Sequence, residues 1–189
     1  MEVRLDNVRM AFVNIFEPKQ VNNEGEPKYT VTALLPKGSP QLEIMEKAMK
    51  EVAREKWPKE AARVYKALVS EAKTCLRDGD NKNYGGFENH MYVSASSKVR
   101  PLIMDMDKTK LTNADAARIY SGCYGYVLLD VWAQDNQHGK RINAVLKGVM
   151  KAADGEAFTG GAPATEADFA DIEVPEGEEA TAEDFNDLL

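Results

Sequence analysis

The stretch from Arg118 to Thr159 constrains the fold more than any other part of this sequence. It contains two long strand patterns, Tyr120–Ala133 and Arg141–Lys151, separated by a polar turn at Gln134–Gly139. Two extended segments joined by so short a turn pair as an antiparallel hairpin. The sequence therefore predicts a long β-hairpin around which the rest of the chain is organised.

The first strand of this hairpin has one aliphatic and one aromatic face. Side chains alternate between the two sides of a strand, so residues of equal parity share a face. The aliphatic face carries Val127, Leu129 and Val131, and the aromatic face carries Tyr124, Tyr126 and Trp132. The turn and the return strand add Lys140 and Arg141. Aromatic rings beside cations are what a non-specific single-stranded nucleic-acid site needs, because bases stack on the rings while phosphates pair with the cations.

The N-terminal part of the chain predicts a second hairpin. Met1–Phe16 has a strand pattern with a kink at Asp6-Asn7, and it pairs with Lys28–Pro36 across a long polar loop, Glu17–Pro27. Alternation places Val8, Met10 and Phe12 on one face of the first strand.

The segment His90–Arg100 is the clearest alternating strand. Met91, Val93, Ala95 and Val99 point one way, and Tyr92, Ser94, Ser96, Lys98 and Arg100 point the other. The polar face is interpreted as a floor for a phosphate backbone, with a solvated outer face as the alternative.

A loop with paired glycines, Asp80–Asn89, precedes that strand. It contains Lys82, Tyr84, Gly85, Gly86 and Phe87. Paired glycines between two aromatic residues allow another group to approach the backbone closely. The alternative is a turn whose aromatic rings fold back onto the core.

Helical patterns occupy residues 39–78, between the second and third strands. Ser39-Pro40 is a helix start, and Pro58 breaks the first helix just after Trp57. The second helix is predicted to end at Asp78-Gly79. Trp57 is interpreted as core packing of this helical layer. A capping pattern from Thr112 to Asp115 predicts a further short helix before the final hairpin.

Five strands with a short helix before the fourth match the order of an OB-fold barrel. We therefore predict a mostly β chain with a helical insertion at 39–78, in which a five-stranded OB-fold barrel spans residues 1–161 and an acidic disordered tail spans 162–189.

Two cysteines, Cys75 and Cys123, and two scattered histidines give neither zinc spacing nor a disulfide framework, so no metal or cofactor is predicted. No apolar run reaches 18 residues, so no membrane contact is expected, and a reduced cytoplasm is the simplest setting.

Charge is distributed unevenly along the chain. The net charge is −7, yet residues 154–189 hold twelve acidic and no basic residues, which leaves 24 basic and 19 acidic residues in 1–153, a net charge of +5. A basic body attracts phosphate, and the acidic tail competes for the same groove or recruits a partner. The tail ends with hydrophobic residues among carboxylates, which is typical of a docking peptide: Asp184, Phe185, Asp187, Leu188 and Leu189.

Signatures of catalysis are absent from the sequence. It has no P-loop, no GxSxG, no HExxH and no dinucleotide fingerprint, so we expect no enzyme. A metal-dependent nuclease that uses Asp105, Asp107 and Asp130, with Asp135 nearby, remains the alternative from the enzyme class. A DNA-mimic or scaffold protein that acts through its tail is another.

The sequence resembles the short single-stranded DNA-binding proteins encoded by tailed phages. The likeness rests on five segments in the same order: VRMAFVNIFEPK, EPKYTVTALLPK, KVRP, IYSGCYGYV and GKRINAVLKGVMKAADGEAFTGG. The resemblance implies an OB-fold with a helical insertion, non-specific binding of single-stranded DNA, and a role in phage replication or recombination in the host cytoplasm. It also implies that the tail contacts replication proteins and occupies the DNA groove of the free protein.

The predicted binding residues combine face parity with residue type. The aromatic candidates are Tyr84, Phe87, Tyr92, Tyr124, Tyr126 and Trp132, and the cationic candidates are Lys28, Lys82, Lys98, Arg100, Lys140 and Arg141. The same residues suit a strand-annealing or recombination-mediator protein, which is the closest alternative function. Either function is compatible with a homo-oligomer.

Overall fold

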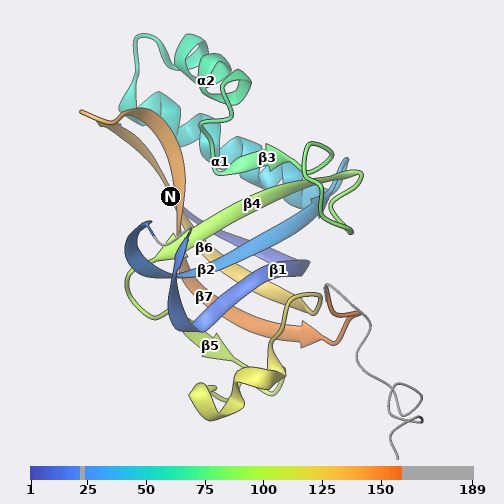
Figure 1. The fold of residues 1–189 in the computed structure, drawn as a ribbon. Helices are drawn as coiled ribbons and strands as arrows, with labels where there is room; N and C mark the ends of the chain where they lie inside the picture. The colour runs from blue at the N-terminus through green and yellow to red at the C-terminus, as the bar shows by residue number, and fades with distance from the viewer. Residues whose placement is uncertain (22–23, 159–189) are drawn as a thin grey trace, which may run out of the picture. The chain divides into compact units, whose positions relative to one another are not determined.

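The structure, a computed structural model, describes residues 1–21 and 24–158. Figure 1 shows the order of its elements. The strands are β1 (Glu2–Val21), β2 (Glu24–Pro36), β3 (Leu76–Asp78), β4 (His90–Ser97), β5 (Leu102–Met104), β6 (Tyr124–Asn136) and β7 (Gly139–Ala153). The helices are α1 (Pro40–Lys56), α2 (Ala61–Ser70) and a short 3-10 helix, Asn113–Arg118.

Five of these strands close into a barrel. β1 pairs with β2 and β6, β2 pairs with β4, and β6 pairs with β7, all antiparallel. The barrel closes where β4 meets β7 in parallel, with Ser96 opposite Val145. This order, β1-β2-β4-β7-β6 and back to β1, is that of an OB-fold, so the predicted five-stranded barrel is confirmed.

The barrel interior is built from the faces that alternation identified. Val127, Leu129 and Val131 of β6 are buried, and Val8 and Met10 of β1 lie in the same core cluster. Burying a Val, Leu or Met side chain fully contributes roughly 1.5–3 kcal/mol, so this inward face fixes the register of the strands. The predicted kink of β1 is also confirmed, because its pairing with β6 shifts register between Leu5 and Val8.

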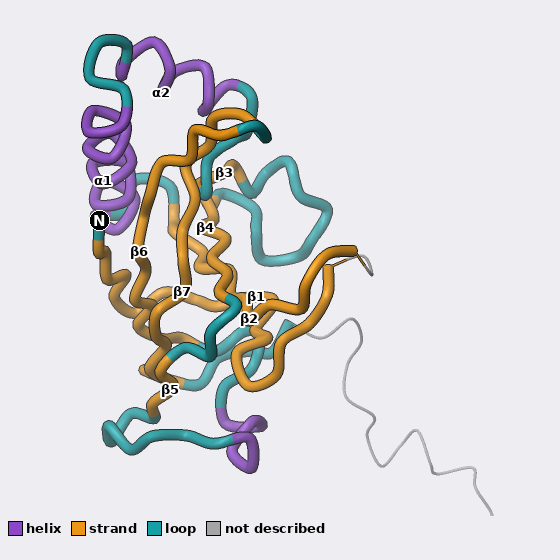
Figure 2. The backbone as a smooth tube through the Cα atoms, turned by 90° about the vertical axis from the view of Figure 1, so that its left-hand side faces the viewer, coloured by secondary structure: helices purple, strands orange, loops and turns teal. Residues whose placement is uncertain are grey.

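The helical insertion covers one end of the barrel. Met45, Met49 and Val52 of α1 join the barrel core, and Trp57 is buried at the end of this helix, as predicted. Figure 2 shows α1 and α2 beside the tip of the β6–β7 hairpin, with β5 and the 3-10 helix at the opposite end. The 3-10 helix begins with the predicted capping box of Thr112 and Asp115.

The prediction that the second helix continues to Asp78 is wrong. α2 ends at Ser70, and Ala72 adopts a left-handed φ of 52°, which turns the chain out of the helix. Leu76–Asp78 then forms β3 and pairs with β4, Leu76 lying opposite Val93. Pairing with the free edge of β4 satisfies backbone groups that would otherwise be unpaired, and it competes with helix continuation.

The predicted loop Glu17–Pro27 is also largely wrong. β1 and β2 continue as a two-stranded ribbon, with Lys19 opposite Lys28 and Val21 opposite Glu24. The backbone hydrogen bonds of an antiparallel ladder do not depend on apolar side chains, so a polar composition is not sufficient to end a hairpin.

Candidate nucleic-acid interface

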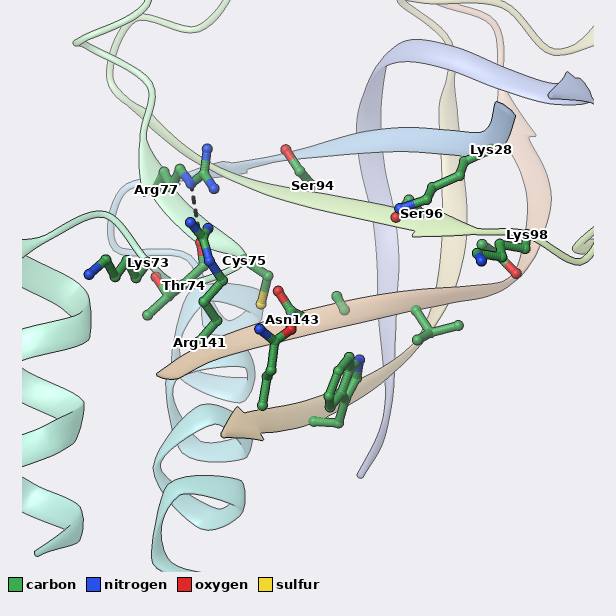
Figure 3. A pocket seen from close by; sticks show the side chains of 15 residues that line it. Lys28, Lys73, Thr74, Cys75, Arg77, Ser94, Ser96, Lys98, Arg141 and Asn143 are labelled. Carbon is green, nitrogen blue, oxygen red and sulfur yellow. Dashed lines mark hydrogen bonds between the residues drawn. The ribbon is translucent and has the colours of Figure 1, made fainter. Parts of the chain in front are cut away.

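A groove lined by cations lies where β3, β4 and the β6–β7 hairpin meet (Figure 3). Its volume is about 430 Å³. Its lining includes five basic side chains and no Asp or Glu: Lys28, Lys73, Arg77, Lys98 and Arg141. A groove of this charge concentrates phosphate groups.

Small side chains form the middle of the groove. Ser94 and Ser96 of β4 lie on its floor, between the cations of β3 and those near the end of β4. Trp132 of β6 lines the groove and is 41% exposed, and it lies opposite Asn143 in the hairpin register. Small floor residues beside an exposed indole leave room for a flat ring to stack.

Two of the five cations have acidic partners outside the groove lining. Lys98 pairs with Glu26 and holds the pKa of that carboxyl below its usual range, mainly through a direct hydrogen bond. Lys73 lies 2.7 Å from Glu71. All four side chains are substantially exposed, so these pairs are weak and the cations can exchange partners with a phosphate.

The tip of the β6–β7 hairpin is fastened to the helical insertion. The Trp57 indole Nε1 donates a 2.7 Å hydrogen bond to Asp135. The Lys140 ammonium lies 2.7 Å from a carboxylate oxygen of Glu60, just before α2. Lys140 and Arg63 both lower the pKa of Glu60, mainly by hydrogen bonding. Lys140, predicted as a phosphate contact, is thus engaged in fixing the hairpin that carries Trp132 and Arg141.

Four of the predicted binding residues meet in the groove, namely Lys28, Lys98, Trp132 and Arg141. Sequence reasoning missed Lys73, Arg77, Gln134 and Asn143, which line it as well. The sequence pattern places Lys73 and Arg77 in the last part of the second predicted helix. The signal that was available is the apolar pair Cys75-Leu76 between two basic residues, a pattern that also suits a short strand.

The prediction that Tyr92 lies on an exposed face of β4 is wrong. It is 4% exposed and packs with Ala11, Leu34 and Phe87 in a second, smaller hydrophobic cluster. Alternation separated the two faces of β4 correctly at Val93, which is buried, and Ser94, which is exposed. It is wrong for Val99, which is 75% exposed because β4 ends at Ser97. The loop before β4 covers the outer face at Tyr92, and strand periodicity carries no information about such a cover.

The aromatic face of β6 does not form one site. Tyr126 lines a separate apolar groove with Leu102, Met104 and Leu128, and Tyr124 lies against Gly155. Eight residues of strand span about 26 Å, so Tyr124 and Trp132 share a face without sharing a ligand position. Arg100 also lies apart, because its guanidinium donates a 2.6 Å hydrogen bond to Asn113.

The three remaining predicted residues of the body, Lys82, Tyr84 and Phe87, lie together on the loop before β4. Phe87 folds back into the small cluster beneath, whereas Tyr84 is exposed. The interpretation that the rings fold back onto the core is therefore confirmed for Phe87 and wrong for Tyr84. The predicted tail residues Asp184, Phe185, Asp187, Leu188 and Leu189 fall outside the described residues.

The carboxylates of the nuclease alternative each have a different partner. Asp105 lies 3.0 Å from Arg118, Asp107 accepts hydrogen bonds from Thr109, and Asp130 pairs with the N-terminal ammonium. Within residues 1–21 and 24–158, no three His, Cys, Asp or Glu side chains are placed to hold a metal ion together. The predicted acidic cluster is therefore not formed by the part of the chain that the structure describes.

Both cysteines lie in the core. Burial raises the pKa of the Cys75 thiol to about 12 and also raises the pKa of Cys123. Neither thiol has the character of a nucleophile. In the described ranges, no helix has the length and apolar character needed to cross a membrane.

Comparisons with known proteins point to one family. The sequence profile described as "Enterobacter phage Enc34, ssDNA-binding protein" matches residues 1–185. The chain is 41% identical over 185 residues to protein p50 of Acyrthosiphon pisum secondary endosymbiont phage 1, covering 96% of this chain and 100% of p50.

Solved structures agree. The single-stranded DNA-binding protein from bacteriophage Enc34, in complex with ssDNA, matches with a TM-score of 0.72 and 28% identity over 84% of this chain and 89% of that chain. The gp2.5 protein of bacteriophage T7 matches with a TM-score of 0.57 over 87% of this chain and 98% of that chain; at 12% identity, this likeness shows the fold alone. With its profile matched along nearly its whole length, the chain belongs to the Enc34 ssDNA-binding protein family of phages.

Proposed function

We propose that this protein binds single-stranded DNA without sequence preference, through the groove that contains Trp132. The observation that carries the proposal is a groove with five basic side chains, no acidic side chain and an exposed indole on one wall. Its relative from phage Enc34 has a solved structure in complex with ssDNA, which supports the same ligand class here.

The groove accounts for affinity without base readout. A base stacked on Trp132 contributes roughly 1–3 kcal/mol whatever its identity, because every base has a flat π-face. The cations contribute a salt-dependent part, with about 0.7 counterions released from a single strand for each phosphate contact. Neither contribution distinguishes one base from another, and neither requires catalysis.

The biological role that fits this activity is coating of exposed strands during phage DNA replication or recombination. The acidic tail regulates binding by competing with DNA for the basic groove, and its terminal Phe185, Leu188 and Leu189 recruit partner proteins. The contrast between a body of net charge +5 and twelve acidic residues in 154–189 supports this division of roles.

Tryptophan fluorescence tests the proposal directly, because the chain has two tryptophans in different settings. Trp57 is buried and hydrogen bonded, so quenching by a bound base reports Trp132. The protein is titrated with oligo-dT and with duplex of equal length at two salt concentrations, as the full chain and as a chain that ends at Gly161. We expect quenching by the single strand, weakened by salt and strengthened by removal of the tail.

Trp132→Ala is the matched variant, and its affinity for single-stranded DNA is measured by fluorescence anisotropy of a labelled oligonucleotide. We expect roughly five- to a hundredfold weaker binding with an unchanged far-UV circular dichroism spectrum. Unchanged affinity in a folded variant would remove Trp132 and this groove from the proposal. If neither the full chain nor the chain that ends at Gly161 bound single strands, the proposed function itself would be wrong.

A further inference from the structure

The groove is continued along the outer face of β4 by an aromatic patch. Tyr92 lies on the same face as Ser94 and Ser96, two residues beyond the groove floor. Arg77, which lines the groove, is the register partner of Tyr92 on β3. The loop Gly79–Asn89 lies over Tyr92, so the surface next to the groove end is formed by this loop.

Four aromatic rings meet at this place. The ring centroids of Phe12 and Tyr84 are 5.0 Å apart in an edge-to-face arrangement. Phe87 lies 5.9 Å from Phe12 and 5.6 Å from Tyr92. Phe87 and Tyr92 are buried and form the base, whereas Phe12 is 38% and Tyr84 is 53% exposed. The upper two rings, Phe12 and Tyr84, are called the loop platform below.

A lysine ammonium lies over the same rings. Lys82 Nζ is 5.4 Å from the centroid of Phe12, 5.5 Å from that of Tyr84 and 5.1 Å from that of Tyr92. In the described part of the chain, the Lys82 ammonium forms no ion pair with a carboxylate within 4 Å. The ammonium is thus held by ring faces alone and has donors to spare for a phosphate.

The backbone of β1 is bent to bring Phe12 to the surface. Alternation after Val8 and Met10 would place Phe12 in the core, but Phe12 has a left-handed φ of 49° and the β1–β2 register shifts after Ala11. Left-handed conformations are unfavourable for bulky residues and persist where the surroundings determine them. A strained backbone that exposes an aromatic ring next to a second exposed ring is an argument for a binding role.

The loop that carries Tyr84 is fixed at several points. Lys37 bridges Asp78 and Asp80, and Asp80 accepts a 2.6 Å hydrogen bond from the backbone of Asn89. The ring of Phe158 lies so close to Gly86 that an added Cβ would stand 2.3 Å from it. Phe158 is itself held by Arg9, whose guanidinium lies 4.1 Å from the ring centroid. The loop platform is therefore ordered before any ligand arrives, which reduces the entropic cost of binding.

We propose that the loop platform is a second base-stacking subsite, which takes an unstacked nucleobase of the same DNA strand that occupies the groove. Lys82 pairs with a phosphate of that strand, and Arg77 lies between the two subsites. Continuity with the groove, aromatic rather than aliphatic composition and the ammonium over the rings all favour a nucleic-acid strand as the occupant. This inference rests on the proposed function of the groove, and it extends the DNA-binding site beyond the groove to the loop platform.

Photo-crosslinking tests the subsite. Oligo-dT strands that carry a single 5-iodouracil at successive positions are irradiated with the full-length protein, and crosslinked peptides are identified by mass spectrometry. We expect one label position to crosslink to Trp132 and a different position, displaced along the strand, to crosslink to Tyr84 or Phe12. Crosslinks at Trp132 without any at Tyr84 or Phe12 would overturn the second subsite and leave the groove in place.

Affinity against strand length gives an independent measurement. We expect Tyr84→Ala and Lys82→Ala to bind the shortest strands like the wild type, and to lose the roughly five- to a hundredfold gain that longer strands give the wild type. Tyr65→Ala is the control, because Tyr65 on α2 also has a lysine near its ring, Lys50 at 6.0 Å, but lies outside the groove. Phe12→Asn tests the other ring, since Asn tolerates a left-handed backbone.

The outcomes separate the two proposals. If Tyr84→Ala bound strands of every length as tightly as the wild type, the second subsite would be wrong. It would also be wrong if Tyr84→Ala lost the same factor in affinity at every length, including the shortest. Failure of the wild-type protein to bind single strands at all would instead overturn the proposed function on which it rests.

Discussion

The indole Nε1 of Trp57 donates a 2.7 Å hydrogen bond to Oδ2 of Asp135, and so joins the end of α1 to the tip of the β6–β7 hairpin. The Lys140 ammonium reinforces the junction, lying 5.4 Å from the Trp57 ring centroid and 2.7 Å from Glu60. The helical insertion therefore does more than cover the barrel end. It holds the hairpin from which Trp132 and Arg141 reach the groove.

Loss of this junction should weaken both the fold and DNA binding. Trp57→Phe keeps an aromatic ring in the core but removes the donor to Asp135, and hydrogen bonds to charged groups contribute about 1.5–3 kcal/mol. Because the Asp135 side chain is 39% exposed, we expect a loss of about 1–2 kcal/mol in the free energy of unfolding, measured by urea denaturation. Trp132→Phe, the control at the exposed tryptophan, should change it by no more than about 0.5 kcal/mol. Equal effects of the two variants would contradict this account.

The junction should also respond to acid. Lys140 and Arg63 lower the pKa of Glu60 in the folded chain. A lowered carboxyl pKa contributes stability that is fully present above the unfolded value of 4.5 and is lost as pH falls through the folded value. In Glu60→Gln this contribution is absent at every pH. The difference in unfolding free energy between wild type and variant should therefore shrink as the pH is lowered from 6 through 4.5 towards 3, and a constant difference over that range would argue against the pair.

Arginines of the groove should determine the salt dependence of binding. Arg77→Ala and Arg141→Ala each remove one phosphate contact, so each should reduce the slope of log affinity against log salt by about 0.7. The control is Arg54→Ala, because Arg54 is exposed on α1 and does not line the groove. Anisotropy titrations with oligo-dT between low and moderate salt give the slopes. Identical slopes for all three variants would place the phosphate contacts elsewhere.

The two neighbouring glycines of the loop before β4 should differ sharply in how well they tolerate substitution by alanine. Gly86 has a φ of 87° and no room for a Cβ beside Phe158, whereas Gly85 has nothing within 4 Å of the added atom. We expect Gly86→Ala to destabilise the fold by about 1–3 kcal/mol, and Gly85→Ala to lie within about 0.5 kcal/mol of the wild type. Hydrogen exchange should show faster exchange of the loop amides in Gly86→Ala alone. Equal behaviour of the two variants would mean that Phe158 does not hold the loop.

Thiol labelling checks the core. Cys75 and Cys123 are buried, and burial raises the pKa of Cys75 to about 12, so both remain protonated at neutral pH. A disulfide reagent such as Ellman's should modify neither thiol in the native protein and both in denaturant. Rapid labelling of native protein at Cys75 would show that the core around this thiol opens.

Side-chain alternation was sufficient to identify the faces of the central strands. Val127, Leu129 and Val131 are buried and Trp132 is exposed, because a strand has a period of two and one face must fill the barrel. The order of the strands followed from their number and from the short helix before β6. These features depend on the alternation of side chains along one strand and on the order of elements along the chain, both of which can be taken from a single sequence.

What could not be predicted depends on contacts between distant segments. Phe12 leaves the core because of a register shift between β1 and β2, and Tyr92 is buried because a loop lies over it. Arg77 joins the groove because β3 pairs with the edge of β4. Lys140 is withdrawn from the groove by Glu60, which is distant from it in the chain. No periodicity within one strand reports a partner of this kind.

The parallel meeting of β4 and β7 has a consequence for how the protein folds. Ser96 and Val145 are about fifty residues apart in the chain, and a parallel pair cannot be closed by a tight turn as a hairpin can. Hairpins form within about 1–10 μs, whereas folds that depend on such distant pairings take milliseconds to seconds. The groove is built across this seam, so the capacity to hold DNA should be the last property that a newly made chain acquires.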